Sequence, residues 1–264
     1  MRRACLVLLA LLSASGTASG ASQIPQRISG TTLPWSLDRG DWEFSSGVTH
    51  RDSVHPPFFG EDSSARRDEL LFCLVDATVG LGSGGEAQIR FGVQRIDPIV
   101  DEDRTGVLDP RITITYELPL RQRLSAALRL EVKLPSAGDE HRLGTDQMDL
   151  FLTGAVGRKR VVWGWAAEAG LAILGHPLRA GVQDDLIVFG ATGWWNGGGD
   201  RLRLFAEISG MAASRFSNDS RVARAGMQIG RRRPIDLAVR RGLTSESETW
   251  GLEAGVTWIR PGRP

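Results

Sequence analysis

The sequence predicts an all-β protein, an antiparallel up-and-down transmembrane β-barrel of about twelve strands. Three observations predict this fold. Apolar and polar residues alternate with a period of two over most of the chain, turn sequences separate the alternating runs, and a secretory signal precedes them. The mean hydropathy of −0.15 excludes a polytopic helical membrane protein, but it is compatible with membrane-spanning strands that alternate.

The first residues have the layout of a secretory signal peptide. Arg2 and Arg3 form a basic region, residues 4–12 form an apolar run too short to cross a bilayer as a helix, and small residues follow. We therefore expect a signal peptide over residues 1–21. The expected boundaries are cleavage after Ala18 or Ala21, an N-terminal segment at 22–40 and the barrel at 41–260.

Charge and cysteine content exclude further classes of protein. Lys and Arg number 32 and Asp and Glu number 31, and removal of Arg2 and Arg3 with the signal leaves 32 − 2 = 30 basic residues, a net charge of about −1. We expect no nucleic-acid partner, because binding to phosphates needs a local surplus of cations. The chain has two cysteines, of which Cys5 leaves with the signal, and this excludes a disulfide scaffold.

The alternation is clearest at residues 111–118 and 124–134. In the second run the even-numbered residues are apolar, and Arg129, Glu131 and Lys133 lie between them. Residues 69–79 and 146–156 alternate poorly. We predict strands near residues 41–49, 69–80, 85–97, 108–118, 123–134, 146–157, 161–174, 182–195, 200–210, 221–230, 234–241 and 249–259.

The position of the charges distinguishes a membrane barrel from a soluble β-sandwich. In a membrane barrel the apolar faces contact lipid and the polar faces line the lumen, so long strands carry charges on their interior positions. Aromatic residues near strand ends are typical of the membrane interfaces; they are Trp42, Phe44, Trp163, Trp165, Trp194, Trp195, Trp250 and Trp258. The predicted lumen-lining residues are Arg90, Glu117, Arg129, Glu131, Lys133, Glu168, Arg203, Glu207, Arg224 and Glu253, with Asp236 and Arg240 on the same faces.

Two interpretations of these charges stay open. They can line an aqueous path whose field selects solutes, or Arg129, Glu131 and Lys133 can pair with Glu117 and Arg90 across adjacent strands and fill the interior. We expect a passive pore or carrier for a small solute, without a cofactor and without enzymatic activity. The alternatives are a structural or surface-interaction barrel with a plugged lumen, and a lipid-modifying outer-membrane enzyme.

Few residues indicate catalytic or binding chemistry. Gly80, Gly82 and Gly85 match the spacing of a dinucleotide-binding loop, but a strand follows them where that loop requires a helix, so a hairpin turn is predicted. The four histidines fall in or beside predicted loops and lack metal-ligand spacing. For a lipid hydrolase, the nearest pair is His50 with Ser45 or Ser46. We predict no catalytic, cofactor-binding or metal site.

Several segments resemble a large group of Gram-negative outer-membrane barrel proteins that are assigned to transport and include the phenol-degradation MetA-like proteins. Two features depart from the group's pattern. Ser136 and Ala137 stand where the group usually shows Thr-Gly-Asp directly after the proline, and the chain continues past Trp258 instead of stopping at an aromatic residue. The segments that carry the resemblance are Asp109-Pro110 and residues 130–139, 143–146, 236–244 and 255–258.

The resemblance implies an outer-membrane barrel that moves small, often hydrophobic, solutes, and it implies no agreed substrate or catalytic residues. Outer-membrane lipid and the barrel-assembly machinery are the partners that we expect. Glu253, Gly255 and Trp258 retain part of the assembly signal of a terminal strand, with Arg260 where an apolar residue is usual. The expected location is the cell outer membrane.

Overall fold

The computed structural model describes residues 33–54, 67–98, 103–120, 124–136, 147–175, 183–197, 201–212, 219–230, 233–245 and 247–262, and the predicted signal peptide lies outside them. In these ranges no helix is long and apolar enough to span a membrane. The strands are β1 (Trp42–Val54), β2 (Arg67–Gly82), β3 (Gly85–Pro98), β4 (Arg104–Val107), β5 (Arg111–Pro119), β6 (Leu124–Lys133), β7 (Asp149–Lys159), β8 (Trp163–Gly175), β9 (Gln183–Gly197), β10 (Leu202–Ala212), β11 (Ser220–Ile229), β12 (Ile235–Gly242) and β13 (Trp250–Arg260).

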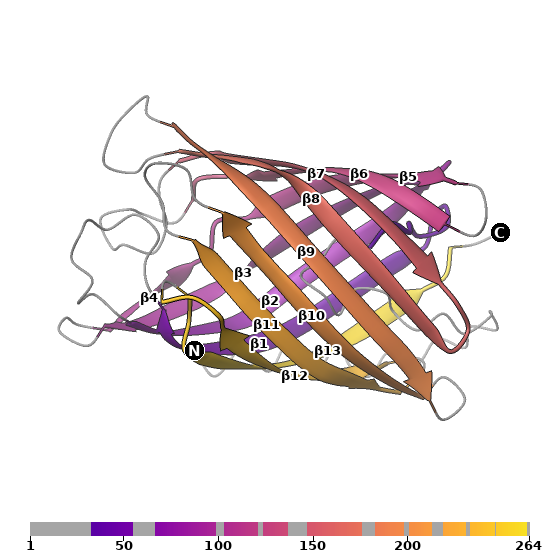
Figure 1. The fold of residues 1–264 in the computed structure, drawn as a ribbon. Helices are drawn as coiled ribbons and strands as arrows, with labels where there is room; N and C mark the ends of the chain where they lie inside the picture. The colour runs from indigo at the N-terminus through magenta and orange to yellow at the C-terminus, as the bar shows by residue number, and fades with distance from the viewer. Residues whose placement is uncertain are drawn as a thin grey trace.

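The strands close into one antiparallel barrel (Figure 1). β1 pairs with both β2 and β13, so the first and last strands form the closing seam. β4 and β5 pair with the same edge of β3, β4 along residues 93–96 and β5 along residues 85–90. These two short strands occupy one place, and the thirteen strands therefore form a closed ring of twelve. The predicted strand at 108–118 corresponds to β5, which begins at Arg111. Residues 108–110 separate it from β4, which precedes it in the chain.

The two ends of the barrel differ in the length of their connections. The end where β1 begins and β13 ends is termed the turn end, and the opposite end is termed the loop end. Short turns on one side and longer loops on the other are typical of bacterial outer-membrane barrels. The connections at the turn end are residues 83–84, 120–123, 160–162, 198–201 and 230–234, and those at the loop end include residues 55–66, 134–148, 176–182, 213–219 and 243–249.

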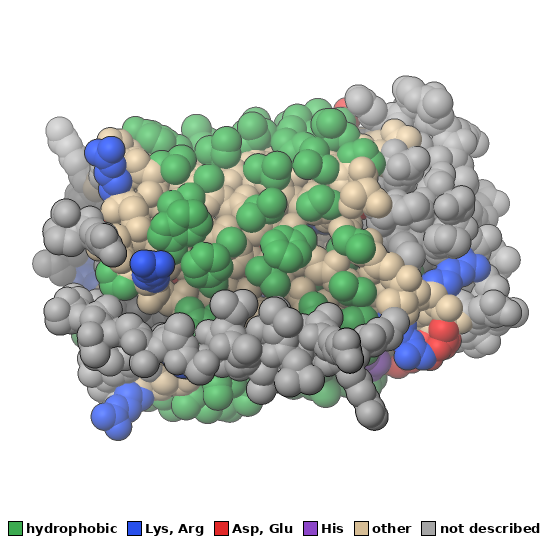
Figure 2. Space-filling view, turned by 180° about the vertical axis from the view of Figure 1, so that it is seen from behind, with side chains coloured by type: hydrophobic (Ala, Val, Ile, Leu, Met, Phe, Trp, Pro, Cys, Tyr) green, Lys and Arg blue, Asp and Glu red, His purple; other side chains and the backbone are tan. Residues whose placement is uncertain are grey.

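The outer surface is apolar and the inner surface is polar. On β5 and β6, Ile112, Ile114 and Leu128 are exposed, whereas Thr113 and Glu131 are buried. Figure 2 shows hydrophobic side chains gathered in a broad band on the face of the barrel that it draws, with lysine and arginine side chains toward its ends. An apolar surface of this extent requires lipid around it. This distribution confirms the predicted fold class.

The glycine motif forms the tight hairpin between β2 and β3. Ser83 and Gly84 have φ angles of 53° and 82°, the left-handed conformation that both central residues of a two-residue type I′ turn adopt. The N–H of Glu117 donates to the carbonyl of Gly84 at 2.7 Å and holds the turn against β5. Because a strand follows, the hairpin prediction is confirmed.

The poor alternation at residues 69–79 corresponds to a β-bulge in β2. The register with β3 shifts between Phe72 and Val75, and Cys73 lies there with a φ of 50°. An inserted residue reverses the inward and outward positions on its two sides. Glu69 and Asp76 are an odd number of residues apart, so on a regular strand their side chains would face opposite sides. The bulge allows both to face the interior.

The aromatic side chains predicted near the membrane interfaces border the apolar band, with one exception. Trp42 and Phe44 stack with ring centroids 5.8 Å apart near the turn end, and Trp250 lies 5.3 Å from the His50 ring near the loop end. The prediction for Trp194 was wrong. Alternation along β9 places its side chain inside the barrel, between the outward-facing residues on either side.

Candidate functional site

The barrel lumen is the candidate site, and the structure places all ten predicted lumen residues on its inward faces. Most of them belong to two charged walls. The Arg111 wall consists of Arg90, Arg111, Arg129, Glu131 and Lys133 on β3, β5 and β6. The Arg224 wall consists of Arg203, Glu207, Arg224, Arg240 and Glu253 on β10 to β13, together with Glu248 in the connection between β12 and β13.

Glu131 is the central carboxylate of the Arg111 wall. It accepts a hydrogen bond from Nη1 of Arg111 at 2.5 Å and a second from Arg129 on its own strand. The hydroxyl of Thr113 donates at 3.3 Å. Three donors around one buried carboxylate satisfy its oxygens and keep it ionised without access to bulk water.

Lys133 closes the loop-end side of this wall. Its Nζ lies 2.6 Å from a carboxylate oxygen of Asp149 on β7 and 3.5 Å from one of Asp109. All three side chains are buried. Asp149 also accepts the N–H of Gly175 at 3.0 Å, so the ammonium links three neighbouring segments of the barrel.

Three cations of the Arg111 wall lie side by side. The strand register sets Arg90 opposite Arg111, and Arg111 opposite Lys133. Arg90 turns to Asp76 on the other neighbouring strand, 2.6 Å away. The charges are therefore paired as one interpretation expected, but with other partners. Arg90 cannot reach Glu131 as its cross-strand neighbour because the register places a second arginine there.

The Arg224 wall repeats this arrangement. Arg224 and Arg240 are opposite each other on β11 and β12, and both donate to Glu253, Arg224 through Nε at 2.6 Å and Arg240 through Nη1 at 2.8 Å. Arg240 also donates to Glu248. Glu207 lies 3.8 Å from Arg224 and is almost fully buried. Three carboxylates, Glu207, Glu248 and Glu253, therefore surround these two guanidinium groups.

Glu117 has a different role from the one expected. Its Oε2 accepts the N–H of Ser36 at 2.9 Å and the Ser36 hydroxyl at 3.1 Å, and its Oε1 accepts the Ser125 hydroxyl at 3.2 Å. Ser36 precedes the first strand. Together with Glu86, which accepts the N–H of Leu37 at 3.3 Å, Glu117 holds a piece of the N-terminal segment inside the turn end.

This piece, residues 34–41, is termed the strap, and it crosses the lumen. At one side Gly40 and Asp41 exchange backbone hydrogen bonds of 2.9 and 3.0 Å with Gly80 on β2. At the other side the Trp35 ring meets the Trp194 ring on β9 edge to face, with centroids 5.4 Å apart. β2 and β9 are six places apart in the ring of twelve, and the strap reaches from one to the other past Glu86 on β3, Glu117 on β5 and Gly157 on β7.

The strap packs against positions that lack side chains. A Cβ on Gly157 would lie 2.9 Å from Pro34 and 3.1 Å from the Trp35 ring, and one on Gly80 would lie 2.7 Å from the carbonyl oxygen of Leu37. Pro34 and Leu37 are buried. Ala155, the inward residue before Gly157 on β7, is apolar and explains part of the poor alternation at residues 146–156.

The wall between the two charged walls is apolar. Ala172, Leu174 and Leu186 on β8 and β9 form a buried cluster toward the loop end. Phe151 packs against it and lies under the guanidinium of Arg111, whose central carbon is 5.3 Å from the ring centroid. Phe151 accounts for the rest of the irregular pattern of β7.

Glu168 lies outside the two charged walls, and Arg203 is the member of the Arg224 wall that contacts Asn196 and Trp194. Glu168 lies inward on β8 between Ala155 and Gly190, and its buried Oε2 has no hydrogen-bond partner among the described residues. Arg203 donates from Nε to Asn196 at 2.9 Å and lies over the Trp194 ring at 5.8 Å. Arg203 thereby supports the ring on which the strap rests.

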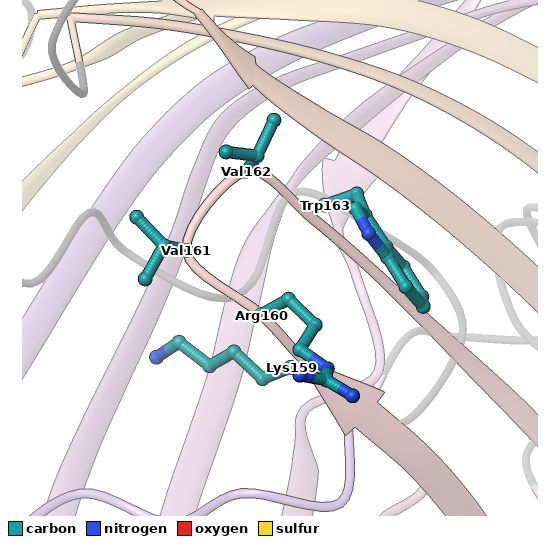
Figure 3. Close-up of a pocket in the computed structure, with 5 residues that line it drawn as sticks. All are labelled: Lys159, Arg160, Val161, Val162 and Trp163. Carbon is teal, nitrogen blue, oxygen red and sulfur yellow. The ribbon is translucent and has the colours of Figure 1, made fainter.

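A hollow of about 540 Å³ opens at the turn between β7 and β8 (Figure 3). Lys159 and Arg160 extend from the end of β7, and Trp163 begins β8. Asn196 anchors this turn, because its N–H and side-chain amide donate to the carbonyls of residues 162 and 161 at 2.6 and 2.8 Å. The hollow is a feature of the rim beside the strap and not of the charged walls.

Among the described residues, those considered for chemistry do not assemble into a site. His50 is described, and it contacts the ring of Trp250. His55, His141 and His176 lie outside the described residues. Among the described residues no group of three His, Cys, Asp or Glu side chains is arranged to hold a metal ion.

Sequence reasoning missed several members of the site. Arg111 and Asp149 begin strands, and their inward position is readable from the alternation that identified their neighbours. Asp76 was hidden by the bulge of β2. The strap has no periodic pattern, and its sequence signal is limited to Pro34 and Trp35, two residues unusual in a solvated leader.

Comparison with known proteins gives the fold its place. The chain matches no protein-family model and no curated protein sequence. The structure is similar to the COG4313 outer membrane channel from Pseudomonas putida F1, with a TM-score of 0.63 and 12% identity over 86% of this chain and 97% of that one. It is also similar to the NanC porin, with a TM-score of 0.52 and 7% identity over 84% of this chain and all of the other. The expected likeness to outer-membrane transport barrels is thus confirmed at the level of the fold.

Proposed function

We propose that the protein is an outer-membrane channel through which a small solute diffuses without chemical change. The observation that carries this proposal is the closed ring of twelve strands whose outer face is apolar and whose inner face holds two walls of charged side chains. Lipid around the outer face and water within the lumen satisfy both surfaces. The turn end, where β1 begins and β13 ends, would face the periplasm.

The strap divides this proposal into two versions. It crosses the turn end, so a diffusing solute has to pass beside Trp35 and Leu37 or displace them. In a passive pore the strap is a constriction, and in a gated carrier it moves. The alternative of a plugged structural barrel is favoured by the same contacts, because hydrogen bonds to Glu86 and Glu117 hold the strap in place.

Conductance of the purified, folded barrel in a planar lipid bilayer tests the proposal. Discrete openings are expected for a passive pore, and a variant lacking residues 22–39 should open more widely. A heat-dependent shift on gel electrophoresis serves as the control for folding. Folded protein that never opens, with or without these residues, would contradict the channel and favour the plugged barrel.

A further inference from the structure

We propose that the lumen prefers small anions, with organic carboxylates as the solute class, and that Arg90, Arg111, Arg224 and Arg240 form the track that selects them. This inference deepens the proposed channel function and rests on it. Two carboxylates of the network, Asp76 and Glu131, serve on this proposal as backing that orients the guanidinium groups.

The first observation is that three of the four arginines, Arg90, Arg111 and Arg240, lie on the water side of their ion pairs. Arg224 is as buried as its partner Glu253, with exposed fractions of 14% and 15%. A carboxylate that is buried beneath its cation contributes to the local structure, while the more exposed cation sets the potential that a passing solute meets. The exposed fractions of the side chains are 47% for Arg90 against 21% for Asp76, 36% for Arg111 against 7% for Glu131, and 22% for Arg240 against 6% for Glu248.

The second observation is that the cations are neighbours. Arg90 is opposite Arg111, and Arg224 is opposite Arg240, on adjacent strands. Like charges directly opposite each other destabilise a sheet, and a lumen that needed only a packed interior would alternate the signs. Adjacent guanidinium groups, in contrast, present parallel N–H donors to a planar carboxylate.

The third observation is that the two arginine pairs face each other. β5 and β11 are six places apart in the ring of twelve, so Arg111 and Arg224 belong to opposite sides of the barrel. Cations of one sign on two facing walls add their potentials in the space between them. The like-charge pairs destabilise the sheet, but on this proposal they create the positive potential that attracts anions.

The test measures ion selectivity in planar bilayers under a potassium chloride gradient. The unmodified channel should pass chloride in preference to potassium, and the double variant Arg90→Gln with Arg111→Gln should lose most of that preference. The variant is expected to fold, because Asp76 still accepts a hydrogen bond from Gln88 at 3.1 Å and Glu131 still contacts Arg129.

Arg95→Gln provides the matched control, because Arg95 faces outward near the loop end and pairs with Asp103 outside the lumen. It should leave the selectivity unchanged. Cation preference in the unmodified channel, or a double variant that selects chloride as before, would overturn the anion track while leaving the channel proposal intact.

Folded barrels that do not open would instead count against the channel. The anion track is then tested separately by calorimetric titration of the detergent-solubilised barrel with succinate. Binding that the double variant weakens at least tenfold, and that Arg95→Gln does not change, is the expected result. An unmodified barrel that does not bind succinate would refute the anion track in this case.

Discussion

The charged walls and the apolar wall of the lumen solve the same packing problem in different ways. In the Arg111 wall, buried polar groups are stabilised by specific partners, as Lys133 is by Asp109 and Asp149. In the apolar wall, Leu186 and Ala172 are stabilised by contact alone. The first arrangement depends on each individual atom, whereas the second depends on volume. On the proposed channel function, a solute would exchange hydrogen bonds with the charged walls, whereas the buried apolar cluster offers it no hydrogen-bonding groups.

The largest effect is expected from breaking the charged wall at Lys133. Lys133→Met should destabilise the barrel by about 3–5 kcal/mol, because Asp109 and Asp149 would remain buried without their cation. Chemical unfolding of the protein in detergent, followed by tryptophan fluorescence, measures this loss. Lys133→Arg keeps the charge and should lose less; equal losses for both variants would contradict the electrostatic explanation.

Substitutions in the apolar wall should reduce the unfolding free energy by a smaller amount. Leu186→Ala is expected to cost about 3 kcal/mol, since it removes a buried side chain that packs with Leu174 and leaves a cavity. The same unfolding experiment applies. Leu171→Ala, on the exposed outer face of the same hairpin, is the control and should cost less. If both substitutions have the same effect, the apolar cluster is not a packed core.

A single methyl group can test the fit of the strap. In Gly80→Ala the new Cβ would overlap the carbonyl oxygens of Leu37 and Asp38. We expect a stability loss of about 1–3 kcal/mol, as for other overpacked sites, together with larger channel conductance as the strap shifts. Gly154→Ala is the matched control, because the nearest atom to its Cβ is 4.0 Å away. Unchanged conductance in Gly80→Ala would show that the strap does not narrow the pore.

The smallest effect belongs to an ion pair outside the lumen. Arg95 and Asp103 are both about half exposed, at 49% and 47%. Arg95→Gln should therefore change the unfolding free energy by at most about 1 kcal/mol. A loss as large as that of Lys133→Met would show that burial does not explain the contrast between lumen and surface pairs.

The parts that sequence could predict are those that follow a period. Even-numbered apolar residues between Arg129, Glu131 and Lys133 predicted the strand, its lipid face and its lumen face together, and the strand is β6. The pairing partners could not be predicted, because they depend on register. A shift of one residue would have set Arg90 beside another neighbour than Arg111.

The features that break a period were the ones that sequence could not interpret. The bulge at Cys73 and the inward Phe151 interrupt alternation for tertiary reasons, namely an extra residue in β2 and an apolar cluster. Trp194 was assigned to the membrane interface together with Trp195. Two adjacent residues on a strand face opposite sides, so only one of the two tryptophans could face lipid. The departures from regularity mark the places where the barrel is specialised.

The root of the strap has a consequence for the order of assembly. The carboxylate of Asp41 accepts the N–H of Gly262 at 2.7 Å, and the two residues flank the seam where β1 meets β13. The bond that anchors the strap thus joins residues that are 221 positions apart in the chain. This hydrogen bond requires the closed seam, so an unfinished barrel would hold the strap only through residues such as Gly80, Glu86 and Glu117.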